Sequence, residues 1–98
     1  MAREIQVEQY LVARVKELGG WAIKGENCAG FPDRIVIAKG FVAFVEVKAP
    51  DGRVSKIQDA MHRRLASFGF PVEVLWSREG VDDFLRDFFF GAHELPTT

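Results

Sequence analysis

The sequence is poor in cysteine, in long apolar runs and in net charge, and each shortage excludes a class of protein. The one cysteine, Cys28, cannot form an internal disulfide, so the fold depends on packing and suits a reducing compartment. The longest apolar run, residues 41–45, is far below the ~20 residues that cross a bilayer, so no membrane partner is expected. Thirteen Lys and Arg against fourteen Asp and Glu give a net charge of −1, which excludes a polycationic nucleic-acid coat.

What the chain does contain fits a single domain over residues 1–98. Its length is close to that of a typical domain, and its 48% hydrophobic and 28% charged residues are ordinary for a globular fold. The first residues carry no apolar signal segment, so we expect a cytoplasmic protein. Charge is uneven along the chain, because residues 50–72 carry a net +2 and residues 73–98 a net −4. The middle of the chain is therefore the better candidate for contact with phosphates.

Hydrophobic spacing predicts the element order α-β-β-β-α-β-α. Apolar residues three and four apart predict a first helix from Ile5 to Leu18, which Gly19 ends. The other predicted elements are strands at 21–23, 35–37, 41–47 and 72–76, and helices at 55–68 and 80–90, with a short tail after the last helix. A helix between the third and fourth strands favours a parallel crossover. The pattern therefore predicts an α/β sandwich with a mixed central sheet.

The hairpin formed by the second and third strands brings two acids together. A turn at Lys39 and Gly40, whether the loop has two or four residues, places Asp33 directly opposite Glu46, whereas a three-residue loop does not. Strand alternation puts Lys48 on the same face as Glu46. Two facing carboxylates destabilise a hairpin unless positive charge lies between them. Lys48 alone could help, but a divalent cation with oxygen ligands does more.

The alternative is a solvated surface cluster of charges without a function. Position weakens this alternative, because Glu46 and Lys48 end a run that is apolar on both faces, which is typical of a central strand. Charges at the end of such a strand are costly to bury and are usually retained for a reason.

Two motifs carry a resemblance to a known family. Gly30-Phe31-Pro32-Asp33 followed by Glu46-Val47-Lys48 resembles the PD-(D/E)xK nuclease signature. Together with Glu8 and the pattern Arg53-x-Ser55-x-x-Gln58, it closely resembles the VRR-NUC family, the virus-type replication-repair nucleases, over residues 4–76. The resemblance implies a restriction-endonuclease-like fold and a metal-dependent endonuclease that hydrolyses DNA phosphodiester bonds, in a bacterial or phage-infected cell.

The resemblance also implies roles for individual residues. Asp33, Glu46 and the carbonyl of Val47 would hold Mg²⁺, with Mn²⁺ as a substitute, because this ion needs few protein ligands besides water and phosphate. Lys48 would orient the attacking water or stabilise charge in the transition state. Glu8 would be an additional carboxylate on the metal side, or else a helix-end carboxylate near the favourable N-terminal dipole.

Other residues are ambiguous or peripheral at this level. Gln58 would lie near the active site, or it would cap its helix through a Ser55-x-x-Gln58 capping box; one side chain is not expected to do both well. His62 is expected to be a surface or helix-flanking histidine. The basic residues expected to contact phosphates are Arg53, Lys56, Arg63 and Arg64.

The small size bears on the substrate. A chain of 98 residues has little surface for reading a long sequence, so structure-selective cutting is favoured over a defined site. The family resemblance implies branched DNA such as four-way junctions, cut by a symmetric homodimer. Phe90 lies off the apolar stripe of the last helix and is either exposed or buried by a second subunit. The rival functions are a DNA-binding module that does not cut, and an assembly protein whose Phe-rich end associates.

Overall fold

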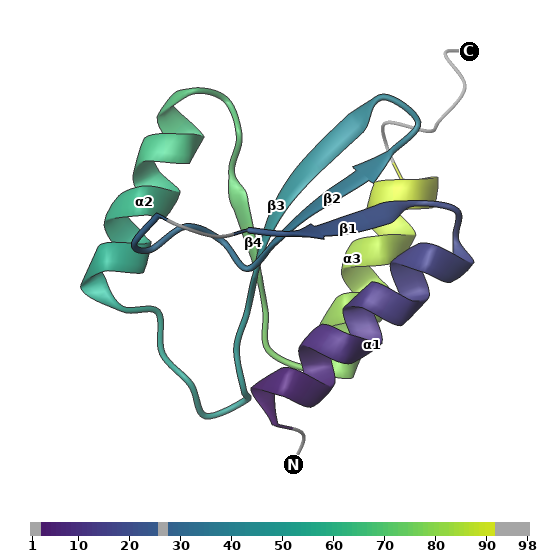
Figure 1. Ribbon diagram of the computed structural model, residues 1–98, viewed down its shortest axis with the longest axis horizontal. Helices are drawn as coiled ribbons and strands as arrows, with labels where there is room; N and C mark the ends of the chain where they lie inside the picture. The colour runs from purple at the N-terminus through teal and green to yellow at the C-terminus, as the bar shows by residue number, and fades with distance from the viewer. Residues whose placement is uncertain (1–2, 26–27, 92–98) are drawn as a thin grey trace.

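A computed structural model describes residues 3–25 and 28–91 and confirms the predicted order of elements. These elements are α1 (Glu4–Glu17), β1 (Trp21–Lys24), β2 (Arg34–Ala38), β3 (Phe41–Val47), α2 (Lys56–Ser67), β4 (Val72–Leu75) and α3 (Arg78–Phe90). Helices α1 and α3 cover one face of the sheet and α2 stands on the other, which is the predicted sandwich (Figure 1). The predicted tail falls mostly at 92–98, outside the described residues. Within the described ranges, no helix is long and apolar enough to cross a membrane.

The sheet is mixed, as expected from the predicted helix between the third and fourth strands. Its strands lie in the order β1-β2-β3-β4. The first two pairings are antiparallel, and β3 pairs with β4 in parallel. The parallel pair is joined through α2, because parallel neighbours cannot be joined by a tight turn. Strand β3 is therefore central, with a neighbour on each side.

The β2–β3 hairpin has the tight turn that the sequence predicts. Ala38 pairs with Phe41, and Lys39 and Gly40 form the loop between them. Both loop residues have positive φ, 39° and 86°, as a type I′ turn requires. Glycine takes this conformation without a steric penalty, which explains its place at the second position. This turn fixes the register of everything that follows along the two strands.

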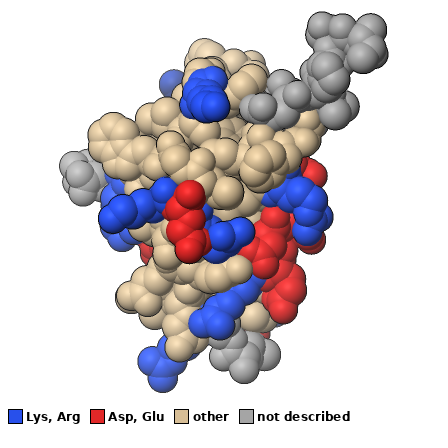
Figure 2. Space-filling model, turned by 90° about the vertical axis from the view of Figure 1, so that its right-hand side faces the viewer, with Lys and Arg blue, Asp and Glu red and all other residues tan. Residues whose placement is uncertain are grey.

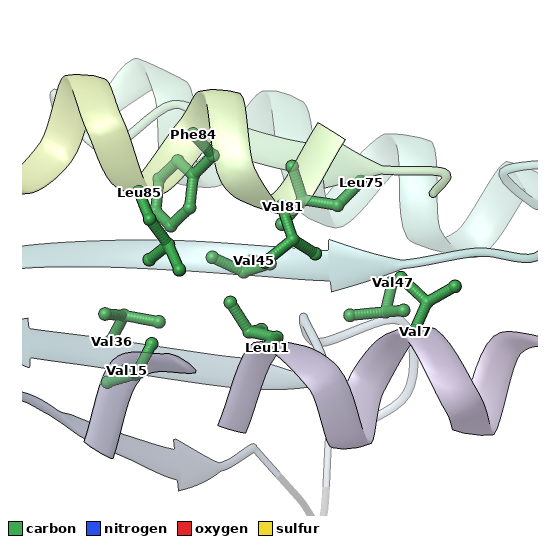
Figure 3. Close-up of a cluster of buried hydrophobic side chains, with 10 residues drawn as sticks. All are labelled: Val7, Leu11, Val15, Val36, Val45, Val47, Leu75, Val81, Phe84 and Leu85. Carbon is green, nitrogen blue, oxygen red and sulfur yellow. The ribbon is translucent and has the colours of Figure 1, made fainter. Parts of the chain in front are cut away.

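The hydrophobic core lies between the sheet and the α1–α3 layer (Figure 3). Helix α1 contributes one side chain per turn to the core, and α3 lies beside it over the same face. The buried core residues are Val7, Leu11, Val15, Val36, Val45, Val47, Leu75, Val81, Phe84 and Leu85. Phe88 and Phe89 are partly buried against this cluster, whereas Phe90 is exposed, in agreement with its place off the stripe.

Helix α2 is held differently from the other two helices. It is amphipathic but has no fully buried residue. Its start is fixed by Ser55, whose Oγ accepts a hydrogen bond from the backbone N–H of Gln58. Polar contacts to β3, described below, therefore contribute much of what docks this helix on the sheet.

We predict that Leu11→Ala destabilises the fold by about 2–5 kcal/mol, because it removes a fully buried side chain from the middle of the core. Urea unfolding followed by circular dichroism measures the change in unfolding free energy. Ile5→Ala is the matched control on the same helix, since Ile5 is exposed and its loss should cost no more than about 0.5 kcal/mol. Equal effects of the two substitutions would contradict this assignment of the core.

Candidate active site

The hairpin register brings Asp33 to the end of β3. Arg34 pairs with Val45, so the next pair along the two chains is Asp33 and Glu46, as predicted. Asp33 lies just before β2, and its side chain reaches the neighbouring strand β3. Its Oδ2 accepts a hydrogen bond of 2.8 Å from the backbone N–H of Val47. The carboxylate of Asp33 is thereby fixed beside the Val47 peptide.

The loop that carries Asp33 packs against the start of α2. Gly30 has a φ of +81°, and a Cβ at this position would lie 2.6 Å from the carbonyl oxygen of Ile57. Only glycine allows that approach and that conformation together. Pro32 follows and is fully buried. The Gly-Phe-Pro-Asp motif is therefore a structural clamp as well as the segment that delivers the acid.

Among residues 3–25 and 28–91, Glu46 is the buried charged side chain, with only 1% of its surface exposed. It points to the α2 face, opposite the core face of Val45 and Val47, as strand alternation requires. Its Oε2 accepts a hydrogen bond of 3.0 Å from Nε2 of Gln58 and lies 3.8 Å from Nζ of Lys48. Its Oε1 is buried without a hydrogen-bond partner.

The environment of Glu46 disfavours its charged form. Burial, followed by the negative charge of Asp33 beside it, raises the pKa of Glu46 to about 8, although the positive charge of Lys48 opposes the shift. Two carboxylates held together in a low-dielectric site repel each other, and the single ammonium of Lys48 does not offset this. The site is therefore short of positive charge.

A divalent cation fits that shortage. Asp33 and Glu46 offer oxygen donors of the kind that hard cations prefer, and the Val47 peptide lies at the same place. Within the described part of the chain, no cluster of three or more Asp, Glu, His or Cys side chains forms a metal site. Two carboxylates and a backbone oxygen leave about half of the positions of an octahedral ion to water and substrate, which suits Mg²⁺ rather than a closed structural site.

Gln58 both caps α2 and lies beside Glu46, the two positions that the sequence left as alternatives. Its Oε1 accepts hydrogen bonds from the backbone N–H of Ser55, at 2.9 Å, and from Nζ of Lys48, at 2.8 Å. Its Nε2 donates to Glu46. The expectation that one side chain would not do both well is wrong, because a carbonyl oxygen has two lone pairs and the amide has a separate donor.

Glu8 contacts basic side chains of the two neighbouring strands β1 and β2. Its Oε2 accepts a hydrogen bond of 2.8 Å from Nε of Arg34 and lies 3.6 Å from Nζ of Lys24, so it ties α1 to β2 and β1. The carboxylate of α1 whose charge raises the pKa of Glu46 is Glu4, one helical turn earlier. A role for Glu8 on the metal side stays a prediction.

His62 is not the surface residue that was expected. Its side chain is only 13% exposed, and its Nε2 lies 3.5 Å from Oε1 of Glu46. Burial lowers its pKa, which favours the neutral imidazole. The available signal was its spacing, since residues four apart on a helix share a face and Gln58 precedes it by four.

The four predicted phosphate contacts lie in and just before α2, the helix that covers the Glu46 side of the sheet. All four are exposed: Arg53, Lys56, Arg63 and Arg64. Figure 2 shows a different side of the molecule, the side of α1 and α3, where both basic and acidic side chains are exposed. Cys28 is an exposed thiol, in keeping with an incidental loop residue.

Comparison with known proteins adds independent findings to this geometry. Residues 4–79 match the VRR-NUC domain. A protein of Acyrthosiphon pisum secondary endosymbiont phage 1, named "Putative nuclease p44", is 38% identical over 82 residues, covering 81% of this chain and 88% of that protein. A solved structure of a VRR_NUC domain superposes with a TM-score of 0.75 at 30% identity, covering 87% of this chain and 97% of its own. The matched fold confirms the α/β class expected from the sequence.

Proposed function

The chain belongs to the VRR-NUC domain family, and we propose that it is a metal-dependent endonuclease that cuts DNA phosphodiester bonds. That it is a nuclease follows from its family and from its phage relative. The observation that carries the proposed chemistry is the pair Asp33 and Glu46, held together at the end of β3 with Lys48 beside them.

We propose that Asp33, Glu46 and the Val47 carbonyl hold Mg²⁺, or Mn²⁺ in its place. When bound, this cation acts as a Lewis acid on the phosphate and makes a water molecule more acidic. The chain supplies the geometry: the Val47 N–H fixes Asp33, and Gln58 fixes one oxygen of Glu46. Asp33 is thus oriented, and Glu46 is held at one oxygen, before a substrate arrives, which lowers the cost of binding the cation.

Lys48 is the proposed catalytic cation. Its side chain is 12% exposed, and its Nζ donates to Oε1 of Gln58 at 2.8 Å. That bond holds the ammonium at the edge of the acidic pair, where it can orient the attacking water and offset charge on the phosphoryl oxygens. A lysine is not a ligand of Mg²⁺, so its contribution differs from that of the two acids.

The substrate that we propose is branched DNA, such as a four-way junction. The support is the small domain, with little surface for reading a long base sequence. A non-cutting DNA-binding module with the same fold is the second candidate, and it requires no intact acidic pair. Cleavage assays on labelled duplex, flap and four-way-junction DNA, with Mg²⁺, Mn²⁺ or EDTA, separate these possibilities.

Glu46→Gln is expected to lower the cleavage rate by more than about 100-fold while DNA binding in EDTA is retained, because the substitution keeps size and removes the charge that binds the cation. The rate on the best substrate and fluorescence anisotropy measure the two effects. Glu17→Gln is the matched control, since Glu17 is an exposed glutamate far from the acidic pair in sequence. Full activity of Glu46→Gln, or wild-type cleavage in EDTA, would refute the proposed mechanism.

Arg63 and Arg64 are proposed to contact phosphates, so replacing both with Gln should weaken DNA binding and flatten its salt dependence. Each lost phosphate contact lowers the slope of log K against log salt by about 0.9. Lys16→Gln with Arg86→Gln removes the same charge from exposed positions on α1 and α3 and should leave the slope unchanged. Equal slopes for the two double variants would place the DNA elsewhere.

We also propose that two subunits associate through the end of α3, which gives two active sites for two cuts. Phe90 is 64% exposed there, beside a cavity of about 230 Å³ that Phe41 and Phe89 also line. An aromatic side chain of this size gains much from burial against a partner.

Sedimentation at micromolar concentration is expected to show a dimer for the wild type and a monomer for Phe90→Asp. Phe68→Asp is the matched control, because Phe68 is equally exposed but lies at the end of α2. A wild-type monomer would rule out the dimer. A dimer that survives Phe90→Asp would remove Phe90 from its interface.

A further inference from the structure

The side chain of His62 lies beside Glu46, and none of the roles assigned so far explains its position. It projects from α2 one turn after Gln58, and both side chains reach Glu46. Gln58 meets Oε2 of that carboxylate, and Nε2 of His62 meets Oε1 at 3.5 Å. Gln58 and His62 thus lie next to different oxygens of the Glu46 carboxylate.

The two atoms that face each other are both without a partner. Oε1 of Glu46 and Nε2 of His62 are the buried side-chain polar atoms of the described residues that make no hydrogen bond. Native proteins rarely leave such atoms unsatisfied, and each case calls for an explanation. Their separation of 3.5 Å exceeds a typical N–H···O bond by only about 0.5 Å. A small rotation of the imidazole would therefore satisfy both.

A carboxylate that is held at one oxygen retains freedom at the other. The terminal torsion of a glutamate is broad, so a single hydrogen bond from Gln58 does not fix the plane of the carboxylate. A second donor on Oε1 would fix it. Hydrogen bonds to metal-binding carboxylates commonly have this effect on the ligands that they orient.

We propose that His62 is a positioning residue that donates a hydrogen bond from Nε2 to Oε1 of Glu46 and so holds this carboxylate in the orientation that binds the divalent cation. The proposal rests on the proposed metal-dependent function. It adds a residue that acts through Glu46 without touching the substrate. Its prediction is specific: loss of the donor weakens cation binding in the absence of DNA, and another side chain with an N–H at the same reach restores it.

The test measures cation binding to the protein without DNA. Free Mn²⁺ is followed by electron paramagnetic resonance, and Mg²⁺ by competition. His62→Leu fills the space without a donor, and His62→Gln places an amide N–H near the position of the imidazole Nε2. Met61→Leu is the control for a neighbouring, half-buried residue of α2. Circular dichroism and the unfolding midpoint establish that each variant is folded, and His62→Phe replaces His62→Leu if the latter does not fold.

We expect His62→Leu to weaken Mn²⁺ and Mg²⁺ binding by about 10–100-fold. His62→Gln and Met61→Leu should stay within a few-fold of the wild type. In cleavage assays, His62→Leu should raise the cation concentration needed for half-maximal rate, and saturating cation should recover most of the rate. A purely structural histidine would change the unfolding midpoint without this split.

Two results overturn the proposal: wild-type cation affinity in the variant without a donor, or an equal loss of affinity in His62→Gln. Both leave the proposed function standing, because the wild type still binds the cation and cuts DNA. Failure of the proposed function shows differently. In that case the wild-type protein itself neither binds the cation nor cleaves any of the three DNA forms.

Discussion

The burial of one carboxylate beside another is the constraint on which the structure of this site depends. Glu46 is sealed between the sheet and α2, and Asp33 lies at the same end of the hairpin. Burial, together with repulsion from Asp33, holds the pKa of Glu46 at about 8. Carboxylates with strongly shifted pKa values gather at functional sites, and a site that lacks positive charge attracts a cation.

Strand β3 makes this arrangement possible because one of its faces packs into the hydrophobic core and the other faces α2. Val45 and Val47 point into the core with α1 and α3, while Glu46 points to α2. The packing of Val45 and Val47 in the core fixes the strand in place. Because side chains alternate along a strand, it also fixes the direction in which Glu46 leaves the backbone. Glu46 thus lies on a central strand, which positions a side chain more accurately than a loop does.

The fold was predictable from the sequence because its determinants are local. Lys39 and Gly40 specify the turn, the turn specifies the register, and the register places Asp33 opposite Glu46. The partners on α2 were harder to predict. The capping box at Ser55 was visible, but a capping glutamine that also bridges Lys48 and Glu46 depends on how closely the helix approaches the sheet.

Glu8 and His62 show that the tertiary contacts of a helical side chain are difficult to predict from the sequence. The sequence left Glu8 either as a carboxylate on the metal side, which the family resemblance implies, or as a helix-end carboxylate, and it favoured a surface position for His62. In the structure, Glu8 accepts a hydrogen bond from Arg34, and the side chain of His62 is largely buried beside Glu46. Helical spacing gives the face of the helix on which a side chain lies. The residues that contact this side chain are determined by packing between elements that are distant in sequence.

The weak anchoring of α2 has a consequence for the lifetime of the site. This helix has no fully buried residue, and the same oxygen of Gln58 serves both its first turn and the side chain of Lys48. Fraying of that turn would therefore release Lys48 and one oxygen of Glu46 while the layer of α1 and α3 stays intact. Regions with few buried apolar contacts open at a lower free-energy cost than the core does. The hydrogen-bonded set of Glu46, Lys48 and Gln58 is thus expected to open and re-form more often than the domain unfolds.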